Sequence, residues 1–405
     1  MIKSKWNRIR MVAVLCTALS TLAIGATVAA TSTTVAGASS KPYVLGVSAG
    51  VTGAAAAIVA GELQGAQAYL NSVNASGGVN GHKIKLVTLD TQNVVATAAA
   101  TFTQLVTQDK ASAVIGDVLS GNCDAQLTVA TRYKVPVVCG TLDPTELKPV
   151  HKYGFTEYGA EAAEANAIIS IISKAPLSIA APKIALIYIA TPSDTPLFNA
   201  VASAAASING TVVYNDPIGA QLDLTTDAAK AVASGANVIV EQIIPQQLQS
   251  LDTALQNDGS SIPIVAEAST ASYQEMGLLK DPTLYQMSLA PFVNASSPQP
   301  AVKAYVKALK HDGITGQSNI NAQSVALTYV TTEAIVKAMK NCGKNCTPAQ
   351  IATALGKVKI NQPGLNTDFS FTPKRHYPQT TFSLFGYSSS KGVHLISSHI
   401  AGNGI

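Results

Sequence analysis

The chain has 405 residues, of which 47% are hydrophobic and 12% charged, a composition typical of a globular protein and not of a disordered one. Its 27 basic and 23 acidic residues give a formal net charge of +4, but four of the basic residues lie within the first ten positions. The remaining charges balance, and no run of Lys and Arg alternates with aromatic residues, so the sequence offers no surface for nucleic acid.

Residues 1–38 are predicted to be a signal peptide for export. Four basic residues precede an almost wholly apolar or small stretch over residues 11–30, and acidic residues are absent. Small-residue cleavage sites follow Ala30 and, better placed, Ala38, so the mature chain is expected to begin near Ser39. The apolar stretch is also long enough for an uncleaved membrane anchor. Either way, we expect an exported protein that works in the periplasm or at the cell exterior.

The first folded unit is predicted to be a strand, a loop, a helix, a turn and a second strand. An apolar strand over 43–47 leads through small residues into a helix whose apolar positions between 59 and 73 recur every three or four residues. The glycine-rich segment 77–81 ends this helix and turns the chain into a strand over 83–89. The first loop of such a unit lies where α/β sheets bind small ligands.

From residue 113 onward, short apolar runs alternate with helical stretches. Strands are predicted at 113–116, 135–139, 184–190, 211–214, 238–242 and 262–266. Helices are predicted at 124–134, 161–174, 195–208, 226–234, 246–257 and 272–279. This alternation indicates right-handed crossovers and parallel sheets.

The pattern changes after residue 292. Helices are predicted at 299–311, 322–341 and 348–355, followed by short antiparallel strands at 369–371, 381–387 and 393–396. A mature chain of about 365 residues is too long for one ordinary core, so two domains are expected. Candidate crossings between them are 155–159, 291–295 and 365–369.

The mature chain keeps four cysteines, an even number that predicts two disulfides in an exported protein. Cys342 and Cys346 would close a small loop at a helix end. Cys123 and Cys139 both follow apolar strands, so that their loops could emerge side by side. Zinc is the alternative, but no histidine lies near any of the four and the histidines form no ligand-like pair, so neither a metal site nor a cofactor is expected.

A series of landmarks runs through nearly the whole mature chain. They are 45–47 with its glycine loop, 77–81 before a Lys-Ile-Lys-Leu strand, 113–116 with Ser120 and Gly121, 135–138 with the Asp143-Pro144 turn, 262–265 with Glu267, and 369–372. In this order they resemble the exported substrate-binding proteins of ABC transporters, of the type I branch typified by the leucine/isoleucine/valine-binding protein.

The resemblance implies an α/β fold of two Rossmann-like lobes with parallel sheets, joined by three hinge crossings (periplasmic binding protein type I). Lobe I is expected to comprise 39–157 and 293–367, and lobe II 158–292 and 368–405. The lobes would close over a small ligand, which stabilises the closed state because it contacts both. The implied protein is a monomer that docks on the membrane subunits of an ABC permease and performs no covalent chemistry.

The resemblance also assigns residues to the ligand. Ser120, followed by Gly121, matches a serine that holds the ligand's carboxylate; alternatively it caps a helix that starts near Asp124. Thr141 matches a threonine that touches the α-amino and carboxylate groups, although the register leaves Asp143 as an alternative, and Asp143 may serve only as a turn residue.

Glu267 matches an acid that pairs with the ligand's ammonium, against the alternative of an exposed acid at a strand end. The loop that contains Asp194 lacks the aromatic residue usual in the family. Tyr158 and Phe292, at two crossings, would supply aromatic contact or only hinge packing. The ligand is therefore expected to be an amino acid or an amide, with a small organic acid left open.

Two other function classes compete with transport. The same fold could serve as a ligand sensor that signals to a membrane receptor. The G-x-S-x-G sequence at 46–50 lies between a strand and a helix and would make Ser48 the nucleophile of a secreted hydrolase, but only a few residues precede it, where that fold needs earlier strands. A dinucleotide site is disfavoured because the glycine spacing does not match.

Overall fold

The computed structural model describes residues 40–53, 55–141, 148–190, 194–219, 221–290, 293, 295–365, 369–378 and 381–402. The predicted signal peptide lies outside these residues, as do Asp143 and Phe292. Within the described part of the chain, no helix has both the length and the apolar character needed to cross a membrane.

The N-terminal part of the chain forms a parallel sheet of five strands in the order β2-β1-β3-β4-β5. Its strands are β1 (Ser40–Ala49), β2 (His82–Asp90), β3 (Ala113–Ile115), β4 (Val137–Cys139) and β5 (Gly154–Thr156). The helices between them are α1 (Ala56–Ala75), α2 (Val95–Thr107) and α3 (Ser120–Tyr133). Strand β1 is central, because Leu45 pairs with Leu86 on one side and with Ala113 on the other.

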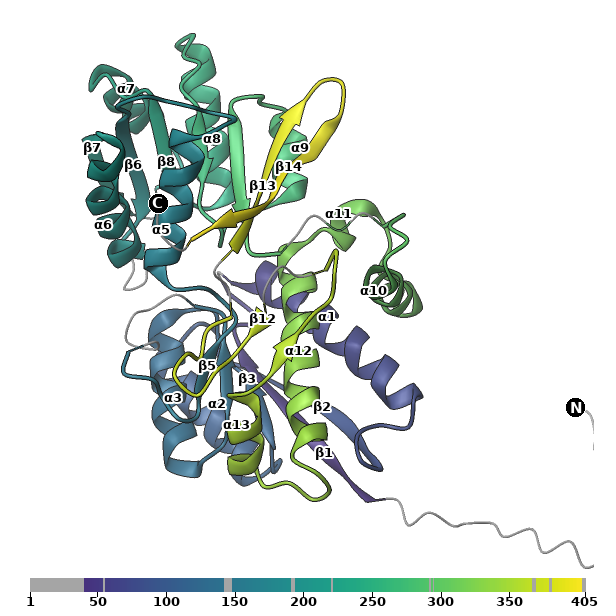
Figure 1. Cartoon of the computed structure of the whole chain (residues 1–405). Coiled ribbons are helices and arrows are strands. Elements are labelled where there is room, and N and C mark those ends of the chain that lie inside the picture. The colour runs from purple at the N-terminus through teal and green to yellow at the C-terminus, as the bar shows by residue number, and fades with distance from the viewer. Residues whose placement is uncertain are drawn as a thin grey trace, which may run out of the picture. The chain divides into compact units, whose positions relative to one another are not determined.

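The second sheet has seven strands in the order β14-β13-β10-β9-β8-β6-β7. They are β6 (Lys183–Ile189), β7 (Thr211–Ile218), β8 (Val238–Gln242), β9 (Ile264–Ala266), β10 (Leu284–Ser288), β13 (Thr381–Ser388) and β14 (Gly392–Ala401). Strands β7, β6, β8, β9 and β10 are parallel to one another. The C-terminal hairpin β13-β14, yellow in Figure 1, pairs with β10 in antiparallel fashion. The accompanying helices are α5 (Glu161–Ser173), α6 (Asp194–Ala205), α7 (Thr225–Ala233), α8 (Pro245–Asn257) and α9 (Tyr273–Leu279), with a short 3-10 turn at Ala206–Ile208.

Alternating side chains of the strands are buried on both faces of this sheet. Leu186 and Val240 belong to one apolar cluster, whereas their neighbours Ile187 and Ile239 belong to another. The central strands β6, β8 and β9 are buried along nearly their whole length, which is why they appear in the sequence as continuous apolar runs and not as alternating ones.

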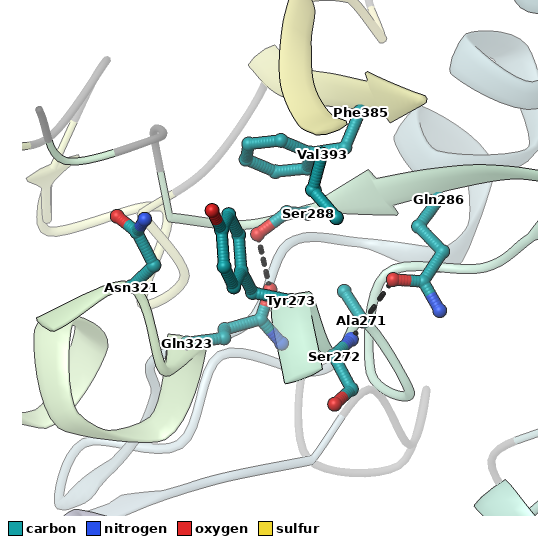
Figure 2. Close-up of a pocket in the computed structure, with 9 residues that line it drawn as sticks. All are labelled: Ala271, Ser272, Tyr273, Gln286, Ser288, Asn321, Gln323, Phe385 and Val393. Carbon is teal, nitrogen blue, oxygen red and sulfur yellow. Dashed lines mark hydrogen bonds between the residues drawn. The ribbon is translucent and has the colours of Figure 1, made fainter. Parts of the chain in front are cut away.

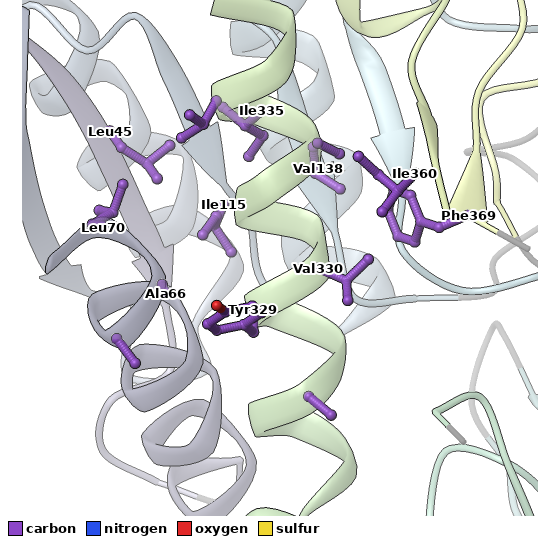
Figure 3. Packing of buried hydrophobic residues seen from close by; sticks show 14 of the residues in the cluster. Leu45, Ala66, Leu70, Ile115, Val138, Tyr329, Val330, Ile335, Ile360 and Phe369 are labelled. Atoms are coloured by element: carbon purple, nitrogen blue, oxygen red, sulfur yellow. The ribbon is translucent and has the colours of Figure 1, made fainter. Parts of the chain in front are cut away.

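Between β10 and β13 the chain returns to the first sheet. This segment contains α10 (Pro300–His311), α11 (Gln317–Ile320), α12 (Gln323–Asn341), α13 (Pro348–Leu355) and a small antiparallel pair, β11 (Lys359–Ile360) and β12 (Phe369–Ser370). Residues of β1, α1, β3, α12 and β12 share one buried apolar cluster (Figure 3), whose members include Leu45, Ala66, Ile115, Tyr329 and Phe369.

Helices α1 and α12 approach each other closely at a glycine. A Cβ atom on Gly65 would lie 2.2 Å from the carbonyl oxygen of Val325 and 3.0 Å from the amide nitrogen of Tyr329. One turn earlier, a Cβ on Gly61 would lie 2.1 Å from Ser324 Oγ. The contact therefore depends on glycine because the backbone of α12 occupies the space that a side chain would take.

The predicted α/β fold with parallel sheets is confirmed, and the departures are local. The structure adds elements that the sequence patterns did not indicate, namely α2, β5, β10, α11 and β11. Helix α3 begins at Ser120 and not near Asp124. Strand β14 runs well past the predicted 393–396. The lobe boundaries at 157/158, 292/293 and 367/368 remain a prediction.

Candidate functional site

Two hydroxyl groups meet at the carboxyl ends of β3 and β4. Ser120 lies beyond β3 and Thr141 beyond β4, their hydroxyl oxygens are 3.1 Å apart, and both residues are buried. Ser120 forms the first turn of α3 and does not cap a later helix, so that alternative is wrong. Gly121 follows it on the exposed side of the same turn. Hydroxyls at a helix N-terminus suit a carboxylate, because the unpaired amides and the helix dipole favour negative charge there.

Behind this hydroxyl pair lies a buried polar network centred on Asp117. Its carboxylate accepts hydrogen bonds from Thr91 Oγ1 at 2.6 Å, Asn122 Nδ2 at 3.0 Å and the amide of Leu119 at 3.0 Å. These bonds fix the loop between β3 and α3 and so position Ser120.

Ser48 belongs to the same buried network. Its hydroxyl lies 2.8 Å from Thr101 Oγ1 and accepts from Gln126 Nε2 at 2.9 Å, and the residue is fully buried. No histidine of the described chain bonds to it; His376 instead approaches the carbonyl oxygens of His151 and Gly154. Ser48 therefore lacks the neighbours that a nucleophile requires.

Glu267 follows β9 and is buried, so the alternative of an exposed strand-end acid is wrong. Its carboxylate accepts from the amide of Ser269 at 2.7 Å, from the hydroxyl of the same serine, and from the amide of Thr270 at 3.1 Å. Burial raises the pKa of Glu267, and the bonds from Ser269 and Thr270 oppose that shift. Asp194, which begins α6, is buried as well and interacts electrostatically with Glu164.

Two acids that the sequence patterns did not indicate flank Gly140. A Cβ at this glycine would lie 3.4 Å from Glu62 Oε1 and 3.5 Å from Glu157 Oε1, and both glutamates are buried. Thr331 on α12 donates a 2.6 Å hydrogen bond to Glu157 Oε2. Burial raises the pKa of Glu157 to about 7; burial and repulsion from Glu157 and Asp117 raise that of Glu62 well above its usual range.

Two further buried glutamates lie close to Glu267. Glu164 on α5 accepts a 2.8 Å hydrogen bond from the amide of Ala268, and Glu241 in β8 accepts a 2.9 Å bond from the amide of Ile243. Burial, and second the charge of Glu267, raise the pKa of both well above the ordinary range. We refer to Glu62, Glu157, Glu164, Glu241 and Glu267 as the glutamate cluster.

Tyr158 lies within electrostatic reach of both parts of this cluster. Burial raises the pKa of its phenol well above the usual value, and Glu157, Glu62, Glu267 and Glu164 raise it further, in that order. No Lys or Arg within the described ranges forms an ion pair with any member of the cluster. Nor is any group of three or more His, Cys, Asp or Glu side chains in those ranges arranged to hold a metal ion.

A separate small pocket lies between the loop after β9, strand β10 and the start of α12 (Figure 2). It is lined by Ala271, Ser272, Tyr273, Gln286, Ser288, Asn321, Gln323, Phe385 and Val393. Gln323 Oε1 accepts from Ser288 Oγ at 2.7 Å and from the amide of Leu289 at 2.8 Å, while its Nε2 donates to the carbonyl of Ala268 at 2.7 Å. None of the predicted site residues lines this pocket.

Both predicted cysteine pairs are at bonding distance. Cys123 in α3 is bonded to Cys139 at the end of β4, with Cα atoms 6.2 Å apart, and Cys342 is bonded to Cys346 after α12, with Cα atoms 6.1 Å apart. The first disulfide joins the two segments that carry the hydroxyl pair of Ser120 and Thr141.

Two sheets of mostly parallel strands, with buried polar side chains at the carboxyl ends of strands in both, define a class of small-ligand-binding α/β proteins. The family model described as periplasmic binding protein matches residues 42–392, and the chain belongs to this family. Its members are substrate-binding proteins and not enzymes, and related proteins bind small molecules for ABC transporters.

Solved structures of low sequence identity share the fold. A fatty acid ABC transporter substrate-binding protein from Thermomonospora curvata is 18% identical, with 89% of this chain and 92% of that one covered and a TM-score of 0.76. A branched-chain amino acid ABC transporter protein from Thermus thermophilus with bound valine is 15% identical, with 89% and 96% covered and a TM-score of 0.77. A solute-binding protein from R. palustris in complex with 4-hydroxybenzoate is 18% identical, with the same coverage and a TM-score of 0.74.

One curated relative matches over a short stretch. An amino acid binding protein of Pseudomonas aeruginosa is 42% identical over 79 residues, which are 20% of this chain and 21% of that protein. The chain thus matches about a fifth of the length of this relative.

Proposed function

We propose that this protein is an extracytoplasmic solute-binding protein that captures a small polar ligand, an amino acid or an amide, between two lobes. The lobes are those predicted from the sequence, 39–157 with 293–367 and 158–292 with 368–405. The protein then delivers its ligand to the membrane subunits of an ABC permease and acts as a monomer after export.

The observation that carries the proposal is the complementary pair of groups at the carboxyl ends of the strands. The hydroxyls of Ser120 and Thr141 lie 3.1 Å apart beyond β3 and β4, and Glu267 is buried beyond β9. Hydroxyl donors suit the carboxylate or carbonyl of an amino acid or amide, and a buried carboxylate suits its ammonium. Tyr158 is buried, and the charge of Glu267 is among those that raise the pKa of its phenol.

A thermal-shift screen of the mature protein against amino acids, amides and small organic acids tests this function. A ligand at 100 times its dissociation constant adds about 2.7 kcal/mol of stability, which raises the melting temperature measurably. We expect clear shifts among amine-bearing ligands. Shifts confined to purely acidic ligands would contradict the ammonium site, and the absence of any shift across the screen would contradict the ligand class.

Transport and sensing use the same binding step and differ in the partner. We expect that deleting the gene abolishes uptake of the radiolabelled ligand by the producing cells. Unchanged uptake together with a lost transcriptional or chemotactic response to the ligand would instead favour a sensor.

A further inference from the structure

The buried charges of the described residues are almost all of one sign. Ten Asp and Glu side chains are buried, whereas no Lys or Arg side chain in the same ranges is. The only buried residues that can carry a positive charge are His82 and His376. Because an isolated buried carboxylate is costly, such an excess calls either for protons or for a cation from outside the chain.

The glutamate cluster contains carboxylate oxygens without any hydrogen-bond donor. Glu62 Oε2 and Glu241 Oε1 are buried and have no partner. Glu62 and Glu157 both place a carboxylate oxygen beside Gly140, and Glu241 pairs across the sheet with Ala266, the residue before Glu267, so each unpartnered oxygen belongs to a side chain close to another acid. A protein that needed these groups only for its own stability would supply a donor, as Thr331 does for Glu157.

The glutamate cluster consists of two groups of side chains. Glu62 and Glu157 converge on Gly140 at the edge of the first sheet, and Glu164, Glu241 and Glu267 lie at the corresponding edge of the second. Tyr158 is close enough to feel the charges of both groups. An aromatic ring that senses the charge of two anionic sites is suited to the alkyl chain of a ligand and attracts its cationic ends.

We propose that the ligand carries two positively charged nitrogens on a short aliphatic chain, as a basic amino acid or a diamine does. One nitrogen is held by Glu62 and Glu157, the other by Glu164, Glu241 and Glu267. Where the ligand also has a carboxylate, the hydroxyls of Ser120 and Thr141 receive it. This inference rests on the proposed binding function and narrows its ligand class.

Calorimetric titration of the mature protein with matched ligands tests the charge requirement. L-lysine, L-ornithine and 1,5-diaminopentane carry two cationic nitrogens, whereas L-leucine and L-glutamine carry one. We expect dissociation constants at least about tenfold lower for the first group. Magnesium chloride at the same concentration is expected to give no heat of binding. Titration in two buffers of different ionisation enthalpy is expected to reveal protons released as the cation replaces them on the acids.

Variants then locate the site. Glu62→Gln keeps the size of the side chain and removes its charge, and we expect it to weaken L-lysine binding by about tenfold or more. Asp252→Asn is the matched control, since it neutralises a buried acid on α8 outside the cluster, and it is expected to leave L-lysine binding unchanged. Circular dichroism confirms that each variant is folded.

The outcomes separate this inference from the proposed function. Binding of L-leucine or L-glutamine without tighter binding of the dications would overturn the inference and leave the binding function in place. Binding of dications that Glu62→Gln does not weaken would overturn the assignment of the Glu62 site. If neither group of ligands binds, and no other amine or amide binds, both this inference and the proposed function are wrong.

Discussion

The carboxylate of Glu267 is held by three hydrogen bonds from Ser269 and Thr270, so an amine that binds there meets a carboxylate that is already oriented. A preoriented carboxylate binds a cation more tightly than a mobile carboxylate does, because binding no longer costs the conformational entropy of ordering the side chain. The same bonds explain why the loop after β9 can keep an acid buried in the absence of a basic residue.

Replacing this acid by its amide isolates the charge. We expect Glu267→Gln to weaken an α-amino-acid ligand by roughly 2–5 kcal/mol, because the ammonium would lose its buried counter-charge. Titration calorimetry on the folded variant measures the change. Asp252→Asn again serves as a control for loss of a buried acid elsewhere, and an affinity equal to that of the unmodified protein would remove Glu267 from the site.

Position after a strand, together with the family resemblance, was the basis for predicting individual site residues, whose role in binding a ligand stays a prediction. It selected Ser120, Thr141 and Glu267, all of which the structure buries at the carboxyl ends of strands. It missed Glu62. This residue lies on α1 between Val59 and Ala66, which belong to the apolar stripe, so the sequence does place an acid on the buried face of the helix. It missed Glu157 because the strand before it, β5, has only three residues. Asp143 and Phe292 lie outside the described residues.

At the scale of elements, the contact between α1 and α12 depends on two small residues one turn apart, Gly61 and Gly65. Helix backbones that approach this closely exclude any side chain at the point of contact. The sequence shows these glycines inside a helical pattern, where they are unfavourable on propensity alone, and this cost is the signal that they have a packing role.

We therefore expect Gly65→Ala to destabilise the protein by about 1–3 kcal/mol, although alanine is the better helix former. The added methyl would lie 2.2 Å from Val325 O, which belongs to a backbone that cannot rotate away. Urea unfolding monitored by circular dichroism measures the loss. Gly277→Ala in α9 is the matched control, because its nearest neighbour is a valine methyl at 3.7 Å. Equal or greater stability of Gly65→Ala would show that the helices can separate without cost.

Three of the missed elements are either short or interrupted by polar residues. Strand β5 and α11 have three and four residues, which is too short for a periodic pattern to be distinct. Strand β10 was missed because Gln286 and Ser288 interrupt its apolar run. Gln286 Oε1 accepts from the amide of Ser272, and Ser288 Oγ donates to Gln323, so both side chains bond to segments that no local pattern can indicate.

At the scale of the whole molecule, the excess of buried acids makes stability depend on pH. The pKa of Glu157 is raised to about 7 from an ordinary value of 4.5, so the folded state favours its neutral form. The contribution of Glu157 to stability is fully present at pH values below the pKa of this side chain in the unfolded chain. It is lost as the pH rises through about 7, the pKa in the folded protein. This group alone is expected to make the ligand-free protein roughly 2–3 kcal/mol less stable at pH 8 than at pH 5.

Comparing the protein with Glu157→Gln isolates this contribution. We expect the pH dependence of the unfolding free energy between pH 5 and pH 8 to be flatter in the variant. Burial lowers the pKa of His376 from 6.5, so this residue makes the protein less stable as the pH falls, which is opposite to the effect of Glu157. Because His376 is present in both proteins, its effect cancels in the comparison. Parallel pH profiles for the two proteins would show that Glu157 titrates in the folded state as it does in the unfolded one.

The overall fold was predicted well because it is encoded redundantly. Apolar strands buried on both faces recur many times along the chain, and each one independently predicts a parallel sheet. The glutamate cluster has no such redundancy, since each acid comes from a different element and only the assembled sheets and helices bring them together.

Helix α12 contacts both groups of the cluster through their neighbours. Gln323 at its start holds the carbonyl of Ala268, next to Glu267, and Thr331 two turns later holds Glu157. Eight residues of helix span about 12 Å, and a helix neither stretches nor compresses appreciably. On the proposed function, α12 thus acts as a ruler, so the choice among ligand chain lengths would be set by a helix whose side chains need not touch the ligand at all.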